Sequence, residues 1–131
     1  MTRFVVDASA VLHLAATGVG IGTEHELLAP TLLRSQTLSL LHEAVATGDL
    51  AVDVARARLA RVGRMKIRLL GDGVLRRRAW EVAEELGWAS TYDAEYVALT
   101  QLQGDALVTT DQAFARRIDG LVPTVGVAAL R

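Results

Sequence analysis

Short apolar runs alternate along the chain with longer stretches in which apolar residues recur at helical spacing. The first run, Phe4–Val6, is rich in β-favouring side chains and ends at Asp7. Residues 8–16 then fit a helix that Thr17 and Gly18 end. Strand followed by helix is the repeating unit of α/β proteins. The pattern therefore predicts an α/β fold with a central parallel β-sheet flanked by α-helices.

The next segment repeats this arrangement after a glycine-rich surface loop at residues 18–23. A second strand is expected at Leu27–Ala29. Pro30 closes that strand and suits the first turn of a helix over residues 31–47, because the first turn needs no backbone donor from proline. Gly48 is placed to cap the end of that helix.

The middle of the chain predicts two more helices separated by a short strand. Asp49 is expected to cap a helix that runs to about Val62, and Ile67–Leu70 fits a strand. A second helix should begin at Asp72 and end at Gly87, which are favoured residue types at those two positions.

The last segment contains the clearest strand after the first. A helix opened by Asp93 should end near Gly104, and the apolar run at residues 106–109 leads directly to Asp111 and a short helix. Residues 123–127 fit an edge strand, because the proline at position 123 would remove a hydrogen bond from a central one.

Composition limits the classes of protein to consider. The chain has 131 residues, of which 51% are hydrophobic, and this is enough for one packed core, so we expect a single domain over residues 1–131. No apolar run is long enough to span a bilayer, and Asp7 falls where a signal peptide would still be apolar. Without cysteine there is no disulfide framework and no thiol nucleophile. We expect a cytoplasmic protein with no membrane association.

Charge is nearly balanced, with 14 basic and 15 acidic residues and a net charge of −1. The whole molecule therefore attracts polyanions only if its charges are sorted onto different faces. The arginines between Arg56 and Arg78 are scattered around their helices and fit solvated surfaces. Arg34, close to Gln36 in sequence, and Arg116 and Arg117, just after Asp111, are candidates for binding RNA phosphates, and a solvated helix face is the alternative.

Three acids stand where the predicted elements meet. Asp7 and Asp111 follow strands directly and Asp93 begins a helix, so all three can lie at the edge where α/β sheets bind ligands. Crowded carboxylates repel one another unless a cation neutralises them, and oxygen ligands without clustered histidines favour Mg²⁺ or Mn²⁺ over zinc. Such a metal activates water against a phosphodiester, which indicates a nuclease. Taken singly, each acid is explained equally well by helix stabilisation, Asp7 and Asp111 as N-caps and Asp93 as a first-turn acid.

Three sequence blocks resemble the signature motifs of PIN domains and occur in the same order. They are Val5–Val11, Thr91–Leu99 and Leu107–Asp111. The resemblance covers nearly the full chain and is greatest to VapC-type toxins, the ribonucleases of type II toxin-antitoxin systems.

The resemblance implies a PIN-like, Rossmann-like fold that binds Mg²⁺ or Mn²⁺ and hydrolyses RNA phosphodiester bonds endonucleolytically. By position, Asp7, Asp93 and Asp111 are implied to be metal ligands and catalytic residues. Ser9 and Thr110 occupy the hydroxyl positions of the motifs and are implied to orient ligands or waters. Family members are generally homodimers inhibited by an antitoxin, so a VapB-like antitoxin is the expected protein partner, and RNA the substrate.

One position departs from the family pattern. The family has a second acid six residues beyond a proline, and counting from Pro30 reaches Gln36, a neutral residue that offers a cation only an amide oxygen. Glu43 lies near the same helical face, but about 10 Å further along the helix axis, too far to replace it. We therefore place Gln36 in the site, where either it belongs to a working arrangement or metal binding is weakened.

Three alternatives to an active ribonuclease follow from the sequence. The first is a catalytically weakened PIN domain, impaired by Gln36, that binds RNA or a protein without turnover. The second is a receiver-like phosphoacceptor domain, which is disfavoured because Lys66 is the only lysine and lies in mid-chain. The third is a nucleotide-binding Rossmann enzyme, disfavoured because the glycines at positions 18, 20 and 22 follow a helix and not a strand.

Overall fold

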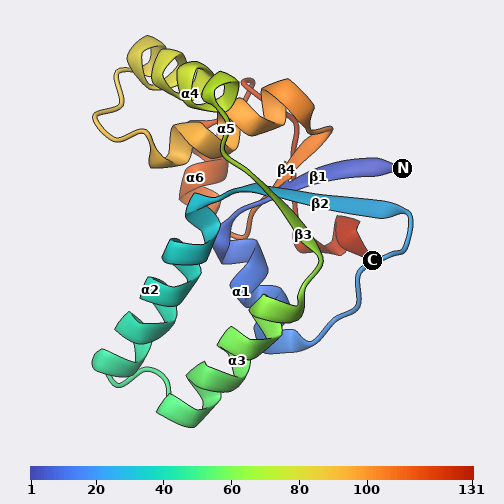
Figure 1. Ribbon diagram of the computed structural model, residues 1–131, viewed down its shortest axis with the longest axis vertical. Coiled ribbons are helices and arrows are strands. Elements are labelled where there is room, and N and C mark those ends of the chain that lie inside the picture. Colours follow the sequence, from blue (N-terminus) through green and yellow to red (C-terminus); the bar gives the residue numbers. More distant parts are fainter.

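The computed structural model describes all 131 residues and contains one five-stranded sheet (Figure 1). All of its strand pairs are parallel, in the order β3-β2-β1-β4-β5. The strands are β1 (Thr2–Val6), β2 (His25–Pro30), β3 (Ile67–Leu70), β4 (Ala106–Val108) and β5 (Thr124–Val125). The α/β fold class with a central parallel sheet is therefore confirmed.

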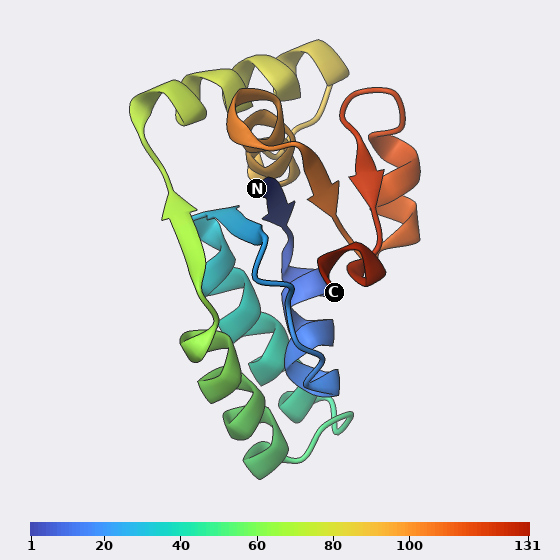
Figure 2. The same ribbon diagram turned by 90° about the vertical axis from the view of Figure 1, so that its right-hand side faces the viewer.

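Helices cover both sides of the sheet. They are α1 (Ala8–Thr17), α2 (Leu32–Ala46), α3 (Val52–Arg64), α4 (Gly73–Leu86), α5 (Tyr92–Gln103), α6 (Gln112–Arg117) and the short 3₁₀ helix η1 (Val127–Leu130). Helices α1, α2 and α3 pack together on one side, and α4 with α5 on the other (Figures 1 and 2). None of these helices combines the length and the apolarity needed to cross a bilayer.

The core is densest around β1, β4 and α5. Val5 and Val6 of β1 and Leu107 and Val108 of β4 are completely buried, as expected for central parallel strands with helices on both faces. Helix α5 is buried along most of its length, because it packs against both β1 and β4. These three elements form the rigid support beneath the carboxyl edge of the sheet.

The register of β1 against β4 positions the first acid. Val6 pairs with Val108, and the Asp7 amide donates to the Val108 carbonyl at 3.2 Å. Because both strands end here, Asp7 and Thr109 leave the sheet side by side. Two segments about a hundred positions apart in sequence thus meet at one edge.

Several predicted boundaries hold in the structure. Strand β3 has the predicted bounds. The Asp72 carboxylate caps α4 by accepting from the Leu75 amide at 2.9 Å, and Gly87 ends that helix in the left-handed conformation that favours glycine. Strong capping residues at both ends allow the bounds of this helix to be predicted from the sequence.

Three predicted boundaries are wrong. Pro30 closes β2 as predicted, but it does not lie in the first turn of α2, which begins at Leu32 after Thr31. Asp49 does not cap α3, which begins at Val52, because the Asp49 carboxylate accepts from the Thr47 hydroxyl at 3.0 Å within a turn. The final strand has only two residues, since the chain turns into η1 directly after β5.

Candidate functional site

Asp7 occupies the junction between β1 and α1 and is the most buried acid of the chain, with 7% of its surface exposed. Its Oδ1 atom accepts from the Ser9 hydroxyl at 2.7 Å and from the Ala10 amide at 2.9 Å. Its Oδ2 atom accepts from the Thr109 hydroxyl. The carboxylate is thus held in one orientation by three neutral donors.

The electrostatic surroundings of Asp7 do not favour its charge. Burial raises the pKa of the Asp7 carboxyl, the hydrogen bonds from Thr109, Ser9 and Ala10 lower it, and the charge of Asp111 raises it further, so that the pKa lies above its ordinary value. No lysine, arginine or histidine forms an ion pair with Asp7. Either a proton or an added cation would compensate the buried charge.

Asp111 stands beside this carboxylate at the end of β4. Its Oδ1 atom caps α6 by accepting from the Phe114 amide at 3.1 Å, while its Oδ2 atom has no hydrogen bond within the chain. The Asp111 amide donates to the Thr109 hydroxyl oxygen at 3.1 Å, and that same hydroxyl donates to Asp7. Thr109 therefore connects the two acids.

Asp93 is held differently, in the first turn of α5. Its Oδ2 atom accepts from Nη2 of Arg117 at 3.0 Å, and 41% of its side chain is exposed. The Arg117 guanidinium also lies over the Trp88 ring, 4.8 Å from the ring centroid. A cation supplied by α6 therefore already neutralises this acid.

Gln36 faces the same region from α2 and is partly buried. Its Oε1 atom accepts from the hydroxyl of Tyr96 at 2.6 Å, and Tyr96 itself is only 2% exposed. Burial and the charges of Asp7, Glu95 and Asp93 raise the pKa of the Tyr96 phenol far above its ordinary value. The phenol thus stays a donor, and the Gln36 amide keeps its oxygen toward it and its NH₂ group free.

The structure connects three of the predicted site residues through hydrogen bonds that meet at Thr109, whereas Asp93 and Gln36 contact Arg117 and Tyr96 instead. Asp7, Ser9 and Asp111 come together at the carboxyl edge of β1 and β4, as expected from the order of the strands. Thr110 contributes its backbone amide, which donates to the Ser9 hydroxyl at 3.0 Å, while its side chain points to solvent. The hydroxyl that contacts Asp7 belongs to Thr109, one residue earlier.

Three contributors were missed by sequence reasoning. Thr109 was assigned to the strand, although its position directly after a buried run is where a strand delivers a side chain to the edge. The sequence indicates no polar role for Tyr96, and it makes Arg117 a candidate for RNA phosphates and not for Asp93. The Tyr96 and Arg117 contacts join elements distant in sequence, and no local signal indicates them.

The donor set fits a hard divalent cation only in part. No group of three or more histidine, cysteine, aspartate or glutamate side chains is assembled as a metal site. Asp7 and Asp111 nevertheless lie at the same edge, where the charge of Asp111 acts on Asp7, and Mg²⁺ uses one or two carboxylates with water and phosphate oxygens completing its shell. The two-carboxylate set therefore fits Mg²⁺ or Mn²⁺ better than a cation that requires a complete protein cage.

Comparison with known proteins adds a fold relationship. No family model matches the chain, and no curated protein matches it either. The crystal structure of PAE2754 from Pyrobaculum aerophilum is similar, with a TM-score of 0.76 and 27% sequence identity. The similarity covers 98% of this chain and 92% of that chain. The chain therefore shares its fold with a solved protein over nearly the whole length of both.

Proposed function

We propose that this protein is a Mg²⁺- or Mn²⁺-dependent endoribonuclease, a hydrolase of the VapC-like toxin type. The observation that carries the proposal is the carboxylate of Asp7. It is buried at the carboxyl edge of the sheet beside Asp111, oriented by three neutral donors and compensated by no cation of the chain. A buried carboxylate with a raised pKa and no cationic partner within the chain is typical of a functional site.

Asp7 and Asp111 would hold the cation, and Asp93 would join them after leaving Arg117. When bound, the cation supplies Lewis-acid activation of water and neutralises charge on the phosphodiester. The Ser9 and Thr109 hydroxyls keep the Asp7 oxygens aimed at the edge. Their role is orientation, because neutral hydrogen bonds leave the negative charge of the carboxylate in place.

Gln36 then serves as a donor and not as a substitute acid. Because Tyr96 engages the amide oxygen, the NH₂ group is free to donate to a non-bridging phosphate oxygen of RNA. A carboxylate at this position would repel that phosphate in the absence of metal. The hydrogen bond between Tyr96 and Gln36 therefore favours an active site in which glutamine has a working role.

The test is cleavage of a mixed RNA pool by the purified protein with Mg²⁺, Mn²⁺ or EDTA. We expect metal-dependent cleavage that Asp7→Asn lowers by at least about a hundredfold, since loss of one preorganised electrostatic group typically costs about a hundredfold to a thousandfold. Asp53→Asn, which removes an exposed acid on α3, is the matched control and should leave the rate unchanged. Absence of cleavage with every metal contradicts the proposal.

A second candidate function is a catalytically weakened PIN domain that binds RNA or a protein without turnover. Two observations favour it, namely the neutral Gln36 at the acidic position and the ion pair that occupies Asp93. Gln36→Glu separates the candidates in the same cleavage assay. A large gain would mean that the native site is impaired, whereas a loss would mean that glutamine belongs to a working arrangement.

The partners proposed with this function are a VapB-like antitoxin and a second copy of the chain, in the cytoplasm. Support for the second copy comes from apolar side chains exposed on the α2 and α3 surface, with Leu38 exposed by 54% and Val52 by 50%. Apolar side chains gathered on one surface often mark an interface. Light scattering of the purified protein distinguishes a dimer from a monomer.

A further inference from the structure

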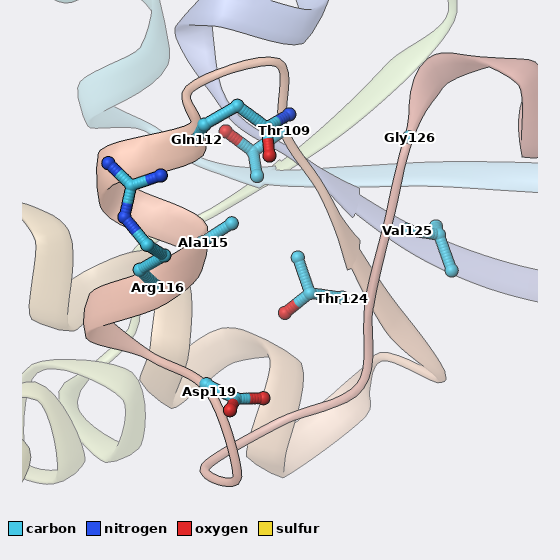
Figure 3. Close-up of a pocket in the computed structure, with 8 residues that line it drawn as sticks. All are labelled: Thr109, Gln112, Ala115, Arg116, Asp119, Thr124, Val125 and Gly126. Atoms are coloured by element: carbon cyan, nitrogen blue, oxygen red, sulfur yellow. The ribbon is translucent and has the colours of Figure 1, made fainter.

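A hollow of about 600 Å³ lies beside the candidate site and is not used by the chemistry described above (Figure 3). Helix α6 forms one wall, β5 and Gly126 form the other, and the end of β4 lies behind them. Its lining is mostly polar and consists of Thr109, Gln112, Ala115, Arg116, Asp119, Thr124, Val125 and Gly126. Its volume is within the range of small-molecule binding pockets.

The hollow and the acidic site share Thr109 as a common wall. This residue lines the hollow and also donates its hydroxyl hydrogen to Asp7. Figure 3 places Thr109 and Gln112 at one end of the hollow and Asp119 at the opposite end. A ligand that extends from the acidic site along α6 would therefore meet Gln112 and Arg116 before it reaches Asp119.

The two charged residues of the hollow are uncommitted. Neither Arg116 nor Asp119 takes part in any ion pair, and both are exposed. Arg117, the next residue, is by contrast bound to Asp93. A free guanidinium beside a candidate phosphodiester site suits a phosphate group, because its planar donors match two phosphate oxygens at once.

The remaining lining residues offer hydrogen bonds and space. The Gln112 amide has no partner within the chain and can both donate and accept. The Thr124 hydroxyl donates to the Val122 carbonyl at 3.3 Å, which leaves its oxygen as an acceptor. Gly126 faces open space, since a Cβ atom there would meet nothing within 4 Å. The lining contains no aromatic ring, so recognition must depend on polar edges and not on stacking.

We propose that this hollow binds one nucleotide of single-stranded RNA next to the phosphodiester at the acidic site. Arg116 binds the phosphate of that nucleotide, and Asp119 accepts a hydrogen bond from its ribose 2′-hydroxyl. A single-stranded substrate is required, because only an unpaired nucleotide can leave the stack and enter a recess beside the sheet. The inference rests on the proposed nuclease function and names the substrate class of the same site.

Arg116 is tested by binding, which does not require turnover. The probe is a short, unstructured, fluorescein-labelled oligoribonucleotide titrated with the Asp7→Asn protein at several salt concentrations. Adding Arg116→Ala should weaken binding by about tenfold and lower the slope of log affinity against log salt by about one unit, since one phosphate contact is lost. Adding Arg77→Ala, which removes an exposed and unpaired arginine on α4, is the control and should lower affinity by less than about twofold.

Asp119 is tested by the preference for RNA over DNA. Asp119→Ala should reduce the ratio of affinities for the oligoribonucleotide and for the oligodeoxyribonucleotide of the same sequence by about fivefold, because only the ribose offers a 2′-hydroxyl. Loss of the negative charge strengthens the binding of both polyanions alike, so the ratio isolates the hydrogen bond. An unchanged ratio overturns the role of Asp119.

The outcomes separate this inference from the nuclease proposal. If the protein cleaves RNA but Arg116→Ala binds as well as Arg77→Ala, with the same salt slope, the nucleotide site is overturned and the nuclease stands. If no metal supports cleavage but the Arg116→Ala and Asp119→Ala effects appear, the nuclease fails and the RNA site stands. An oligoribonucleotide that does not bind at all overturns the nucleotide site.

Discussion

The carboxylates of Asp7 and Asp93 belong to the same candidate site but have opposite surroundings. Asp7 is buried under the junction of β1 and α1 and accepts three hydrogen bonds, all from neutral donors. Asp93 lies at the surface on α5 and accepts one hydrogen bond from a charged donor, Arg117. One acid is oriented without being neutralised, and the other is neutralised without being buried.

This difference indicates how the site divides its tasks. Neutral donors orient the Asp7 oxygens but do not compensate the negative charge of the carboxylate. The β1 end of the site can therefore bind a cation. The ion pair at the other end is exposed, and exposed pairs contribute only about 0 to 1 kcal/mol, so Arg117 can be displaced at small cost. The site is therefore fixed at the β1 end and adjustable at the α5 end.

Asp7→Asn should have the largest effect on the pH dependence of stability. Burial places the pKa of Asp7 above its ordinary value. Between the ordinary pKa of the unfolded chain and the raised pKa of the folded protein, the folded state therefore binds more protons than the unfolded state. Stability should therefore fall as pH rises through that interval, and above it the ionised Asp7 is a cost. Asparagine removes the cost, and at neutral pH without divalent cations Tm should rise by several degrees, on the order of 1 kcal/mol.

Thermal unfolding in EDTA across the acidic to neutral range measures this effect. Asp53→Asn, at an exposed position, should show the same pH dependence as the unmodified protein. Added Mn²⁺ should raise the Tm of the unmodified protein and leave that of Asp7→Asn unchanged, because the ligand binds only the folded site. A lower Tm for Asp7→Asn at every pH would mean that the buried charge is not a cost.

Tyr96→Phe tests the connection between the two ends of the candidate site, at Asp7 and at Asp93. The hydroxyl of Tyr96 experiences the charges of both Asp7 and Asp93 while it donates to Gln36. Removing it leaves the Gln36 oxygen without its donor, which should lower the free energy of unfolding by about 1 kcal/mol. Tyr92→Phe is the control on the same helix, since the Tyr92 side chain is exposed and its hydroxyl has no partner.

The two tyrosine variants are compared by urea unfolding and by RNA cleavage. Cleavage by Tyr96→Phe should fall, because the Gln36 amide becomes free to rotate, and Tyr92→Phe should match the unmodified protein in both assays. Equal unfolding midpoints for the two variants would show that the hydrogen bond between Tyr96 and Gln36 contributes nothing to the fold.

Arg117→Gln tests the α5 end of the site, where Arg117 pairs with Asp93, and should have the smallest effect on stability. It removes the pair with Asp93 and the contact with Trp88, each worth less than about 1 kcal/mol at an exposed position. Freed from its partner, Asp93 should bind Mn²⁺ more readily, and calorimetry should record a several-fold rise in affinity, on the order of 1 kcal/mol. Unchanged Mn²⁺ affinity would mean that Asp93 does not take part in metal binding.

Much of the fold could be predicted because local signals agree with the tertiary structure. The strand ending at Asp7 and the helix between Asp72 and Gly87 combine the correct periodicity with favoured caps. Asp49 shows where this reasoning fails. An aspartate ahead of a helical pattern is a strong capping signal, but the neighbouring Thr47 hydroxyl binds its carboxylate and the helix begins three residues later.

The candidate site was predictable as far as it depends on strand ends. Asp7 and Asp111 lie together because parallel neighbouring strands deliver their last residues to one edge. The choice between Thr109 and Thr110 depended on a shift of one residue, which exchanges the two faces of a strand. The hydrogen bond between Tyr96 and Gln36 joins residues 60 positions apart, and no local sequence pattern predicts it.

The hydrogen bond between Asp7 and Thr109 has a consequence for the biosynthesis of the protein. The two residues are 102 positions apart, so Asp7 emerges from the ribosome long before its partner is translated. Until β4 and α6 have been added, the nascent chain has Asp7 and Ser9 but lacks Thr109 and Asp111. A ribosome therefore carries no assembled site until both β4 and α6 have been translated.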